Sequence, residues 1–450
     1  MEMIAARILC AGLYASDDQP LNFQEQVFTE ISSGIICILF ITPEKFERNA
    51  QFRTLLKNMA TFQGIHFIID EVHCVKNYAY FRESWCYLSQ LKTICPTALI
   101  LMMTATLTYN NARDIMTNLG LDFSCVKIIH GATLKRDELI YEIIKKKEYR
   151  EENLKETITQ IKSIPECSII YCATQKDCYE VADFLRINLR DENIKVMVAT
   201  NAFGLGINMP DVCLVIHYTM PLNLSNYIQE TGRAGRDGLS AKCILLYARK
   251  DVRVLYNIVA GERESLTDIT TKGEEMRQVY LMECQKKIWE IIFFCETKYE
   301  CRQNALTQYH NWKTPLLEIQ SSTIESSCGK CDVCQLRAKE KLIVKDMKMP
   351  ALKLLNVVEV ITGLGSNIII AKDVVDIFCK SKSALPKYKE LEIYRKEQDA
   401  EVKLTNDEAK RLFNDLVIRG MILTDIILQR GKTAGVFSWT FPVLGVSDGT

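Results

Sequence analysis

Two carboxylates and a histidine stand directly after a mostly apolar run in the first third of the chain. Asp70, Glu71 and His73 follow the run Ile65–Ile69. A carboxylate pair at the carboxyl end of a strand suits nucleotide hydrolysis, because one carboxylate can hold Mg²⁺ through water while the other orients and deprotonates the attacking water. We assign these roles to Asp70 and Glu71 respectively. An exposed acidic turn is the alternative interpretation of the same short motif.

Two threonines end the next apolar run. Thr104 and Thr106 follow Ala98–Met103. Two hydroxyls at a strand end beside the acidic pair could relay hydrogen bonds between a nucleotide site and a nucleic-acid site. This prediction depends on the carboxylate pair, since Thr-Ala-Thr is a common string.

A glycine-rich basic segment carries the strongest catalytic signal. Gln229–Gly238 contains Arg233 and Arg236, which lie three residues apart and are flanked by glycines. Such arginines can present their guanidinium groups to a phosphate without crowding, and arginine is the residue type that stabilises a transferring phosphoryl group. A basic turn of no catalytic importance is the alternative.

A second glycine-containing segment lies about thirty residues upstream and argues against that alternative. Ala199–Ile207 follows another apolar run, and it contains Gly204 and Gly206. These glycines permit close approach of the backbone to a ligand. The two segments together favour phosphate binding.

Three cysteines with two-residue spacing predict a metal site. Cys328, Cys331 and Cys334 lie in one short segment, and Cys301, which follows a long helical pattern, supplies a fourth thiol. Four thiolates at about 2.3 Å satisfy tetrahedral Zn²⁺ and leave no open position, so the site would be structural. Buried free thiols are the alternative, and most of the 18 cysteines of the chain fit that description.

The elements that must position these residues alternate between short apolar runs and amphipathic segments. The apolar runs are too continuous for half-exposed strands and predict parallel strands buried on both faces. We expect strands at Ile35–Ile41, Ile65–Ile69, Ala98–Met103, Cys167–Cys172, Lys195–Thr200, Cys213–His217 and Cys243–Tyr247. Helical periodicity lies between them at Phe46–Met59, Ser84–Thr93, Asn110–Leu119 and Lys176–Leu189. The first half of the chain is therefore α/β, and its polar stretch Lys145–Lys155 predicts a solvated linker or helix face.

Taken in this order, the segments resemble the motifs of a superfamily 2 helicase, and specifically of the RecQ family of DNA helicases. The matching segments are Ile41–Glu44 (similar to motif Ib), Asp70–Cys74 (motif II), Thr104–Thr106 (motif III), Ser168–Cys172 (motif IV), Ala199–Asn208 (motif V) and Gln229–Gly238 (motif VI). The resemblance extends over nearly the whole chain. It implies an ATP-dependent DNA helicase that unwinds duplexes in the 3′ to 5′ direction, with ATP between two RecA-like lobes and Mg²⁺ on Asp70.

The resemblance also implies roles for single residues. His73 would couple hydrolysis to DNA, Gln229 would act within motif VI, and Arg233 and Arg236 would be the arginine-finger pair. The implied nucleotide contacts are Asp70, Thr104, Thr106, Gly204, Gly206, Arg233 and Arg236. The implied DNA contacts of the two lobes are Tyr78, Phe81, Arg82 and Thr200, with Tyr78 able to stack on a base.

After Asp251 the pattern becomes helical, and here the resemblance implies a zinc-binding subdomain followed by a winged helix. Lys272–Thr297 has a long helical pattern, and Leu404–Leu416 resembles the recognition helix of the family. The implied DNA contacts of the winged helix are Lys380, Ser381, Lys382, Asn406, Lys410 and Arg411. Lysine and serine suit phosphate contacts, which position a protein without reading sequence. Solvated surface lysines are the alternative for any one of them.

The end of the chain predicts a β-ribbon at Ile422–Phe441. Gly431–Thr433 resembles the end of a phosphate loop, but Ile426 stands where that loop needs its first glycine. We therefore interpret this segment as a basic wing tip.

The expected organisation has four parts. An incomplete first RecA-like lobe would cover residues 1–130 and a second lobe residues 131–262. The zinc-binding subdomain would follow at 263–340, and the winged helix would occupy 341–450.

The sequence departs from the family pattern at the phosphate loop. No GxxxxGK[ST] occurs in the 450 residues, so the β- and γ-phosphates of ATP would lack their main cradle. We expect a copy truncated at its N-terminus, with an incomplete first lobe and impaired hydrolysis. The rival hypothesis is a catalytically inactive protein that binds DNA through the zinc and winged-helix parts. An RNA helicase ranks third, because it would share the core motifs but not the cysteine cluster.

The composition restricts the class of protein, but the balanced charge does not indicate a binding partner. The chain is 48% hydrophobic and 25% charged, and its 56 basic residues balance 56 acidic ones. These values exclude a disordered tail protein, and the apolar runs are far shorter than the ~20 residues of a membrane span. The weakly signal-like stretch Ile8–Ala15 follows Glu2, so we do not expect secretion. We expect a nuclear location in a eukaryote and a cytoplasmic one otherwise, with DNA junctions of single strand and duplex as the partner.

Overall fold

The computed structural model describes most of the chain and divides it into two compact units. We call Met1–Ala132 the first unit and Thr133–Thr450 the second unit. The described residues are 8–14, 19–62, 64–77, 83–104, 107, 109–129, 135–164, 166–189, 194–201, 211–264, 271–309, 327–340, 345–363, 370–382, 384, 386–389, 391, 404–426 and 442–446. None of the helices in these ranges combines the length and the apolar character that crossing a bilayer requires.

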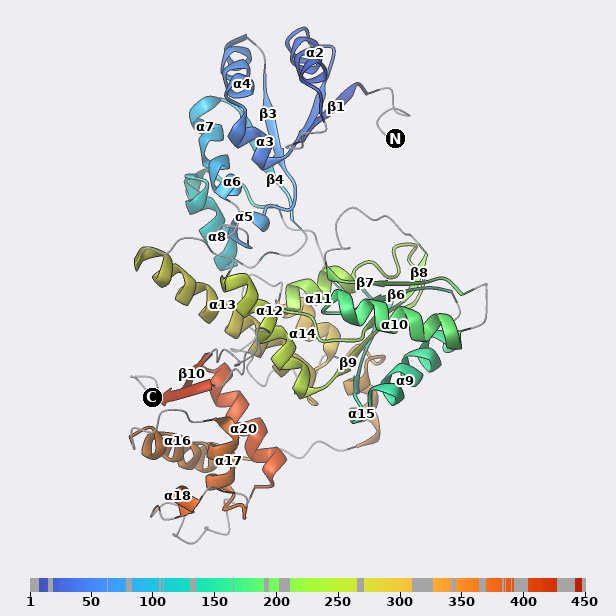
Figure 1. The fold of residues 1–450 in the computed structure, drawn as a ribbon, viewed down its shortest axis with the longest axis vertical. Coiled ribbons are helices and arrows are strands. Elements are labelled where there is room, and N and C mark those ends of the chain that lie inside the picture. Colours follow the sequence, from blue (N-terminus) through green and yellow to red (C-terminus); the bar gives the residue numbers. More distant parts are fainter. Residues whose placement is uncertain are drawn as a thin grey trace, which may run out of the picture. The chain divides into compact units, whose positions relative to one another are not determined.

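The first unit contains two separate pairs of parallel strands flanked by short helices (Figure 1). The pairs are β1 (Cys10–Leu13) with β2 (Ile38–Ile41) and β3 (His66–Ile69) with β4 (Leu99–Met102). Its helices and single turns are α2 (Leu21–Ser32), α3 (Pro43–Arg48), α4 (Ala50–Phe62), α5 (Cys74–Asn77), α6 (Glu83–Cys86), η1 (Tyr87–Gln90), α7 (Leu91–Ile94), α8 (Tyr109–Asn118) and η2 (Phe123–Cys125). The strands predicted before motif Ib, motif II and motif III are confirmed, each shortened by one to three residues at an end.

Several local features of the first unit differ from the predictions, including the helix expected at Ser84–Thr93, which is divided into α6, η1 and α7. The helix expected at Phe46–Met59 is two helices, because the backbone of Asn49 is extended and its side chain accepts a hydrogen bond from the amide of Phe52 at 2.8 Å. An N-cap residue of this kind starts a new helix. The stretch with a weak resemblance to a secretion signal forms β1 instead, in which Leu13 is fully buried.

The sheet of the first unit is packed on one face only. Ile69 is buried, and Phe67 and Met102 pack against the same core cluster. The alternate residues point the other way, and Ile68, Leu99 and Leu101 are exposed by 65%, 68% and 52%. The prediction that β3 and β4 are buried on both faces is therefore wrong in the described structure. Successive side chains of a strand point to opposite faces, and the helices pack on one of them.

The second unit is built on a five-stranded parallel sheet with the order β5-β9-β8-β6-β7. The strands are β5 (Leu139–Lys145), β6 (Cys167–Tyr171), β7 (Val196–Ala199), β8 (Val212–His217) and β9 (Ala241–Tyr247). Every residue of β6 is buried, which agrees with the prediction of parallel strands covered on both faces. The edge strand β5 was not predicted, because Glu142 and Lys145 interrupt its apolar run. The polar stretch Lys145–Lys155 is the connection from β5 and the first turns of the next helix.

Helices cover both faces of this sheet (Figure 1). On one face, α9 (Arg150–Ser163) and α10 (Gln175–Asn188) pack through Ile161 and Val181 against Ile170 and Ile216. On the other face, Tyr141 of β5 contacts Tyr227, which contacts Phe294. The remaining helices before the cysteine cluster and around it are α11 (Leu224–Thr231), η4 (Arg249–Asp251), α12 (Val252–Glu264), α13 (Thr271–Glu296), α14 (Arg302–Tyr309) and α15 (Asp332–Lys339).

The last part of the second unit is a small helical core with an antiparallel ribbon. Its elements are α16 (Lys348–Gly363), α17 (Ala371–Phe378), α18 (Pro386–Lys389), α20 (Asn406–Ile418), β10 (Ile422–Ile426) and β11 (Pro442–Val446). Val358, Val374 and Phe413 from three of these helices meet in one core cluster. β10 pairs with β11, so the expected ribbon exists with its second strand slightly later than Phe441. The segment Gly431–Thr433 lies outside the described residues.

Candidate nucleotide and metal sites

Parallel pairing of β3 and β4 brings the predicted carboxylates and a predicted hydroxyl to one edge of the sheet. The Met103 amide donates to the Ile69 carbonyl at 2.9 Å, and the Val72 amide donates to the Met103 carbonyl at 3.0 Å. These bonds place the turn after β3 beside Thr104 at the end of β4. Carboxyl ends of adjacent parallel strands meet at one edge of a sheet, which is where open α/β folds bind ligands.

Glu71 has an unusual backbone conformation at this edge. Its φ is +50°, in the left-handed region that side chains with a Cβ rarely adopt. The amide of Glu71 donates to Asp70 Oδ1 at 2.9 Å, which stabilises the turn locally. Asp70 itself is exposed and faces solvent at the strand end. Strain of this size persists only where the surroundings hold it, and such positions cluster at functional sites.

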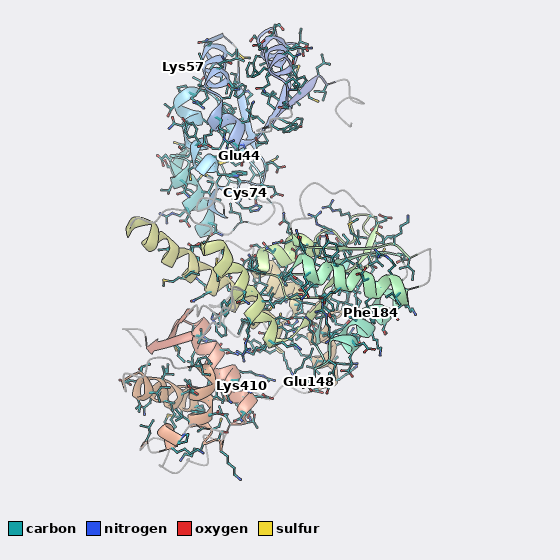
Figure 2. All side chains as sticks on the ribbon, viewed as in Figure 1. Glu44, Lys57, Cys74, Glu148, Phe184 and Lys410 are labelled. Atoms are coloured by element: carbon teal, nitrogen blue, oxygen red, sulfur yellow. The ribbon has the colours of Figure 1, made fainter. Side chains whose placement is uncertain are left out.

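His73 connects the two predicted motifs. Its Nδ1 lies 3.2 Å from Glu71 Oε2 and 3.1 Å from Thr104 Oγ1. Burial opposes the charged imidazolium, but hydrogen bonds with Cys74 and Glu71 more than offset it and raise the pKa of His73 to about 9. The imidazole is therefore protonated at neutral pH and can donate to both neighbours. Cys74, at the start of α5, follows it in the chain (Figure 2).

The arginine loop, which we define as Gly232–Gly238, follows α11 in the second unit. The side chain of Asn223 caps the start of α11 by accepting from the Asn226 amide at 2.8 Å. Arg233 is only 7% exposed, whereas Arg236 is exposed. The two predicted finger residues thus have different surroundings. Gln229, in the last turn of α11, is half-buried.

The four predicted metal ligands come together. The Sγ atoms of Cys301, Cys328, Cys331 and Cys334 all lie within 4.8 Å of one another, and Cys301 and Cys331 are each 1% exposed. The Cys328 and Cys334 sulfurs are 3.9 Å apart, close to the ~3.8 Å between thiolates bound to one tetrahedral Zn²⁺ at ~2.3 Å. No disulfide joins these residues.

Backbone amides support the sulfurs of this cluster. The amides of Cys328, Cys331 and Cys334 donate to the sulfurs of Cys301, Cys328 and Cys331 at 3.4, 3.3 and 3.4 Å. A hydrogen bond with Cys331, together with the backbone amides of Asn304 and Cys328, outweighs burial and lowers the pKa of Cys301 well below its usual range. Donors aimed at sulfur stabilise thiolates, so the donor set fits a tetrahedral metal ion.

The chain is similar in sequence to known helicases. The DEAD/DEAH box helicase family matches residues 8–115, and the helicase conserved C-terminal domain family matches residues 187–238. The RecQ-like DNA helicase blm-1 of Caenorhabditis elegans is 28% identical over 98% of this chain and 45% of its own length. The ATP-dependent DNA helicase hus2/rqh1 of Schizosaccharomyces pombe is 29% identical over 93% of this chain and 31% of its own length. Over most of its length, the chain is similar to RecQ-family helicases of superfamily 2.

The chain spans less than half the length of those two relatives. Among solved structures, Saccharomyces cerevisiae Dbp5 bound to RNA and ADP BeF3 is 15% identical, with a TM-score of 0.37, over 63% of this chain and 74% of that chain.

Two buried residues beside the arginine loop were not predicted. His217 ends β8, and its Nε2 lies 2.7 Å from Oε2 of Glu230 in α11. His217 is 0% exposed and Glu230 is 5% exposed. The ring of Tyr171 stacks on His217 with centroids 5.4 Å apart, and the ring of Tyr227 lies 4.9 Å from it. A histidine at the end of an apolar run was the available signal, but only folding pairs it with Glu230.

The DNA contacts predicted for the C-terminal core lie after α17 and in the first turns of α20. Lys380, with φ +52°, and Ser381 are half-buried directly after α17, and Lys382 is exposed. The exposed residues Asn406, Lys410 and Arg411 lie in the first turns of α20, and Figure 2 labels Lys410 there.

Several predicted site residues lie outside the described residues. They are Thr106, Tyr78, Phe81, Arg82, Gly204 and Gly206. Thr200 is described, directly after β7, and it is half-buried.

Proposed function

We propose that this chain acts as a RecQ-like ATP-dependent DNA helicase, in which strand-end carboxylates and the arginine loop act on ATP. The observation that carries the proposal is the hydrogen-bonded group of Glu71, His73 and Thr104 beside the exposed carboxylate of Asp70. Asp70 would hold Mg²⁺, which neutralises charge on the transferring phosphoryl group. Glu71 would orient the attacking water and accept its proton.

His73 offers a route from a nucleic-acid contact to the catalytic carboxylate. Its protonated Nδ1 is shared between Glu71 and Thr104. A displacement of Thr104 by a bound strand would change the hydrogen bonding of the imidazole that holds Glu71. We propose that this is how DNA stimulates hydrolysis, as the family resemblance implies.

The two arginines of the arginine loop would have separate duties. Arg236 is exposed, so we assign the arginine-finger role mainly to it. Arg233 is buried beside Tyr171, whose pKa burial raises to about 12 and whose hydroxyl interacts with the guanidinium. Arg233 would then act on ATP from a buried position in the arginine loop. Gln229 and the segment with Gly204 and Gly206 keep the nucleotide-binding roles that the family resemblance implies.

The cysteine cluster would hold a structural Zn²⁺ ion. Four thiolates saturate the ion and leave no position for substrate, so its contribution is folding free energy. We propose residues 263–340 as a zinc-binding subdomain, and residues 1–130 and 131–262 as the two RecA-like lobes.

Residues 341–450 would form a winged helix that binds duplex backbone. The exposed basic residues Lys382, Lys410 and Arg411 support this assignment. Lysine and arginine supply most contacts to phosphates, and these contacts do not read the base sequence. Tyr78, Phe81, Arg82 and Thr200 would bind the single strand. A 3′ to 5′ direction, a junction substrate and a nuclear role in recombination or repair follow the family resemblance.

Hydrolysis by the purified chain tests the proposal. DNA should stimulate ATP hydrolysis, and Glu71→Gln should reduce kcat by at least ~10²-fold because the general base is lost. Glu25→Gln, which removes an exposed carboxylate from α2 of the same unit, should change nothing. Absence of hydrolysis at saturating DNA contradicts the enzymatic proposal for this chain.

The absence of a GxxxxGK[ST] segment from the 450 residues favours a second candidate, an inactive DNA-binding protein. Equilibrium binding separates the two. Mg²⁺-dependent ATP binding that Asp70→Asn weakens supports the helicase. Duplex binding that ATP does not alter, and that Lys410→Gln weakens, supports the inactive protein.

A further inference from the structure

The arginine loop is held through its backbone. The amide of Gly235 donates to the carbonyl of Val212 at 3.0 Å, and Gly235 has a φ of +63°. A Cβ added at Gly235 would lie 3.0 Å from Glu138 Cγ and 3.0 Å from the carbonyl oxygen of Leu239. The middle of the loop is therefore pressed closely against the residues that precede β5.

Arg136, which stands just before β5, reaches the middle of the loop. Its Nη2 donates to the carbonyl of Ala234 at 2.9 Å and to the carbonyl of Gly235 at 3.3 Å. Its Nε donates to Glu138 Oε1 in an ion pair. A planar guanidinium can hold one carboxylate and two carbonyls at fixed angles, which an ammonium group cannot reproduce.

Ala234 and Gly235 are the two residues between Arg233 and Arg236. Fixing their carbonyls fixes the direction in which both arginine side chains leave the loop. Errors of about 1 Å in the position of a charge-stabilising group can reduce a rate about 10²-fold.

Residues that flank the cysteine cluster hold the backbone of Arg136 in turn. Gln303, two residues after Cys301, donates from Nε2 to the carbonyl of Arg136 at 2.7 Å. Lys330, between Cys328 and Cys331, donates from Nζ to the carbonyl of Asp137 at 3.2 Å. Residues beside the cysteine cluster thus hydrogen-bond to the backbone of Arg136 and Asp137, the same short segment that supports the arginine loop.

We propose that Arg136 is a positioning residue for the arginine loop, and that the metal-bound cysteine cluster keeps it in place through Gln303 and Lys330. For the catalytic consequence the proposal rests on the proposed ATP hydrolysis. Its structural part does not depend on hydrolysis.

Substitution of Arg136 tests the positioning role. In Arg136→Gln, amide exchange over residues 232–238 should accelerate by about tenfold, because the loop opens more readily. The kcat for ATP should fall by about tenfold or more with a nearly unchanged KM, because the arginines assist the transition state rather than ground-state binding. Arg136→Lys should restore only part of kcat, since it keeps the charge without the fork.

Lys135→Gln provides the matched control. Lys135 is the neighbouring residue, and it forms an exposed ion pair with Asp137 at 2.9 Å. It should leave both exchange in the loop and kcat at the wild-type values. Equal effects of the two substitutions, or unchanged exchange in both Arg136→Gln and Arg136→Lys, would overturn the positioning role.

Metal removal tests the connection to the cysteine cluster. A chelator added to the full chain should accelerate exchange at residues 135–138 and 232–238, and Gln303→Leu should reproduce that acceleration with the metal still bound. Exchange that rises only around the cysteines would overturn the connection. If wild type shows no ATP hydrolysis, the proposed function fails, while the exchange measurements still decide the role of Arg136.

Discussion

The two units carry the same kind of strand sequence but bury it differently. In the second unit, Ile170 and Ile216 are both 0% exposed, because α9 and α10 cover one face of the sheet and α11 and α13 the other. In the first unit, Ile68 and Leu99 are 65% and 68% exposed on strands with an equally apolar pattern. A continuous apolar run therefore reports a strand's capacity for burial, and only the helices around it decide whether both faces are covered.

The two units also differ in the interactions that stabilise them. The second unit has a sheet covered on both faces and a buried cysteine cluster, so its core and its metal ligands support one another. The first unit stabilises its strands from one side and leaves a patch of Phe40, Ile68, Leu99, Leu101 and Met103 exposed. Patches of this kind on soluble proteins mark interaction surfaces or aggregation hazards. The following predictions test this contrast.

Loss of the metal site should have the largest effect, and in the second unit only. Cys331→Ser should lower the free energy of unfolding of that unit by on the order of 5 kcal/mol, because metal-binding energy in a structural Zn²⁺ site is folding energy. Thermal unfolding together with the measured zinc content checks this. Cys284→Ser, which changes a cysteine of α13 outside the cluster, should retain the zinc. Full zinc content in Cys331→Ser would contradict the assignment of the ligands.

Truncation of equivalent strand residues should separate the two sheets. Ile216→Ala should cost about 3–4 kcal/mol, because it leaves a cavity in a fully packed core. Ile68→Ala should cost less than about 0.5 kcal/mol, because the side chain is mostly in water. Chemical denaturation of both variants gives the comparison. Similar losses would show that the exposed face of the first unit is covered in solution.

The stability of the first unit should fall as the pH rises through the pKa of His73. The folded pKa of about 9 lies above the ordinary value of 6.5, so the stabilisation is complete below about pH 6.5 and is lost as the pH passes about 9. The expected loss is up to about 3 kcal/mol. Denaturant unfolding at about pH 6 and about pH 9.5 measures it. His73→Gln should remove this pH dependence, and an unchanged slope in that variant would exclude His73 as its source.

The smallest effects should come from the left-handed residues Glu71 and Lys380, one in each unit. Their φ values are +50° and +52°, so replacement by glycine should relieve roughly 0.5–1 kcal/mol of backbone strain in each case. Lys380→Gly should therefore be more stable than wild type by that amount. Glu71→Gly also loses the ion pair with His73, so its strain is measured against Glu71→Ala, which loses the same pair. Glu71→Gly should also abolish ATP hydrolysis, whereas Lys380→Gly should mainly weaken duplex binding. Unfolding, hydrolysis and DNA titration of these variants make the test. A Glu71→Gly variant no more stable than Glu71→Ala would show that its turn is not strained.

Most of the strands and the metal ligands could be predicted because their signals are local. Three of the four cysteines have a fixed two-residue spacing and the fourth follows a long helical pattern. Such an arrangement is typical of a tetrahedral Zn²⁺ site. β5 escaped prediction because an edge strand tolerates Glu142 and Lys145, so its pattern is mixed. β1 was not predicted as a strand, because four residues are too few to show a hydrophobic period. The pair of His217 with Glu230, and the contact of Arg136 with the arginine loop, join residues 13 and 98 positions apart, and no local pattern reports such pairs.

The amino-acid order is enough to predict which groups could carry chemistry: the carboxylates after β3, the arginines after α11 and the four thiols. These predictions depend on residue type and spacing, and they hold in any fold that keeps the order of the motifs. Folding sets which of these groups are buried, which hydrogen-bond to one another and which face of each sheet is covered. Those outcomes depend on contacts between distant segments, where burial and desolvation change the energy of a group that looks ordinary in the chain.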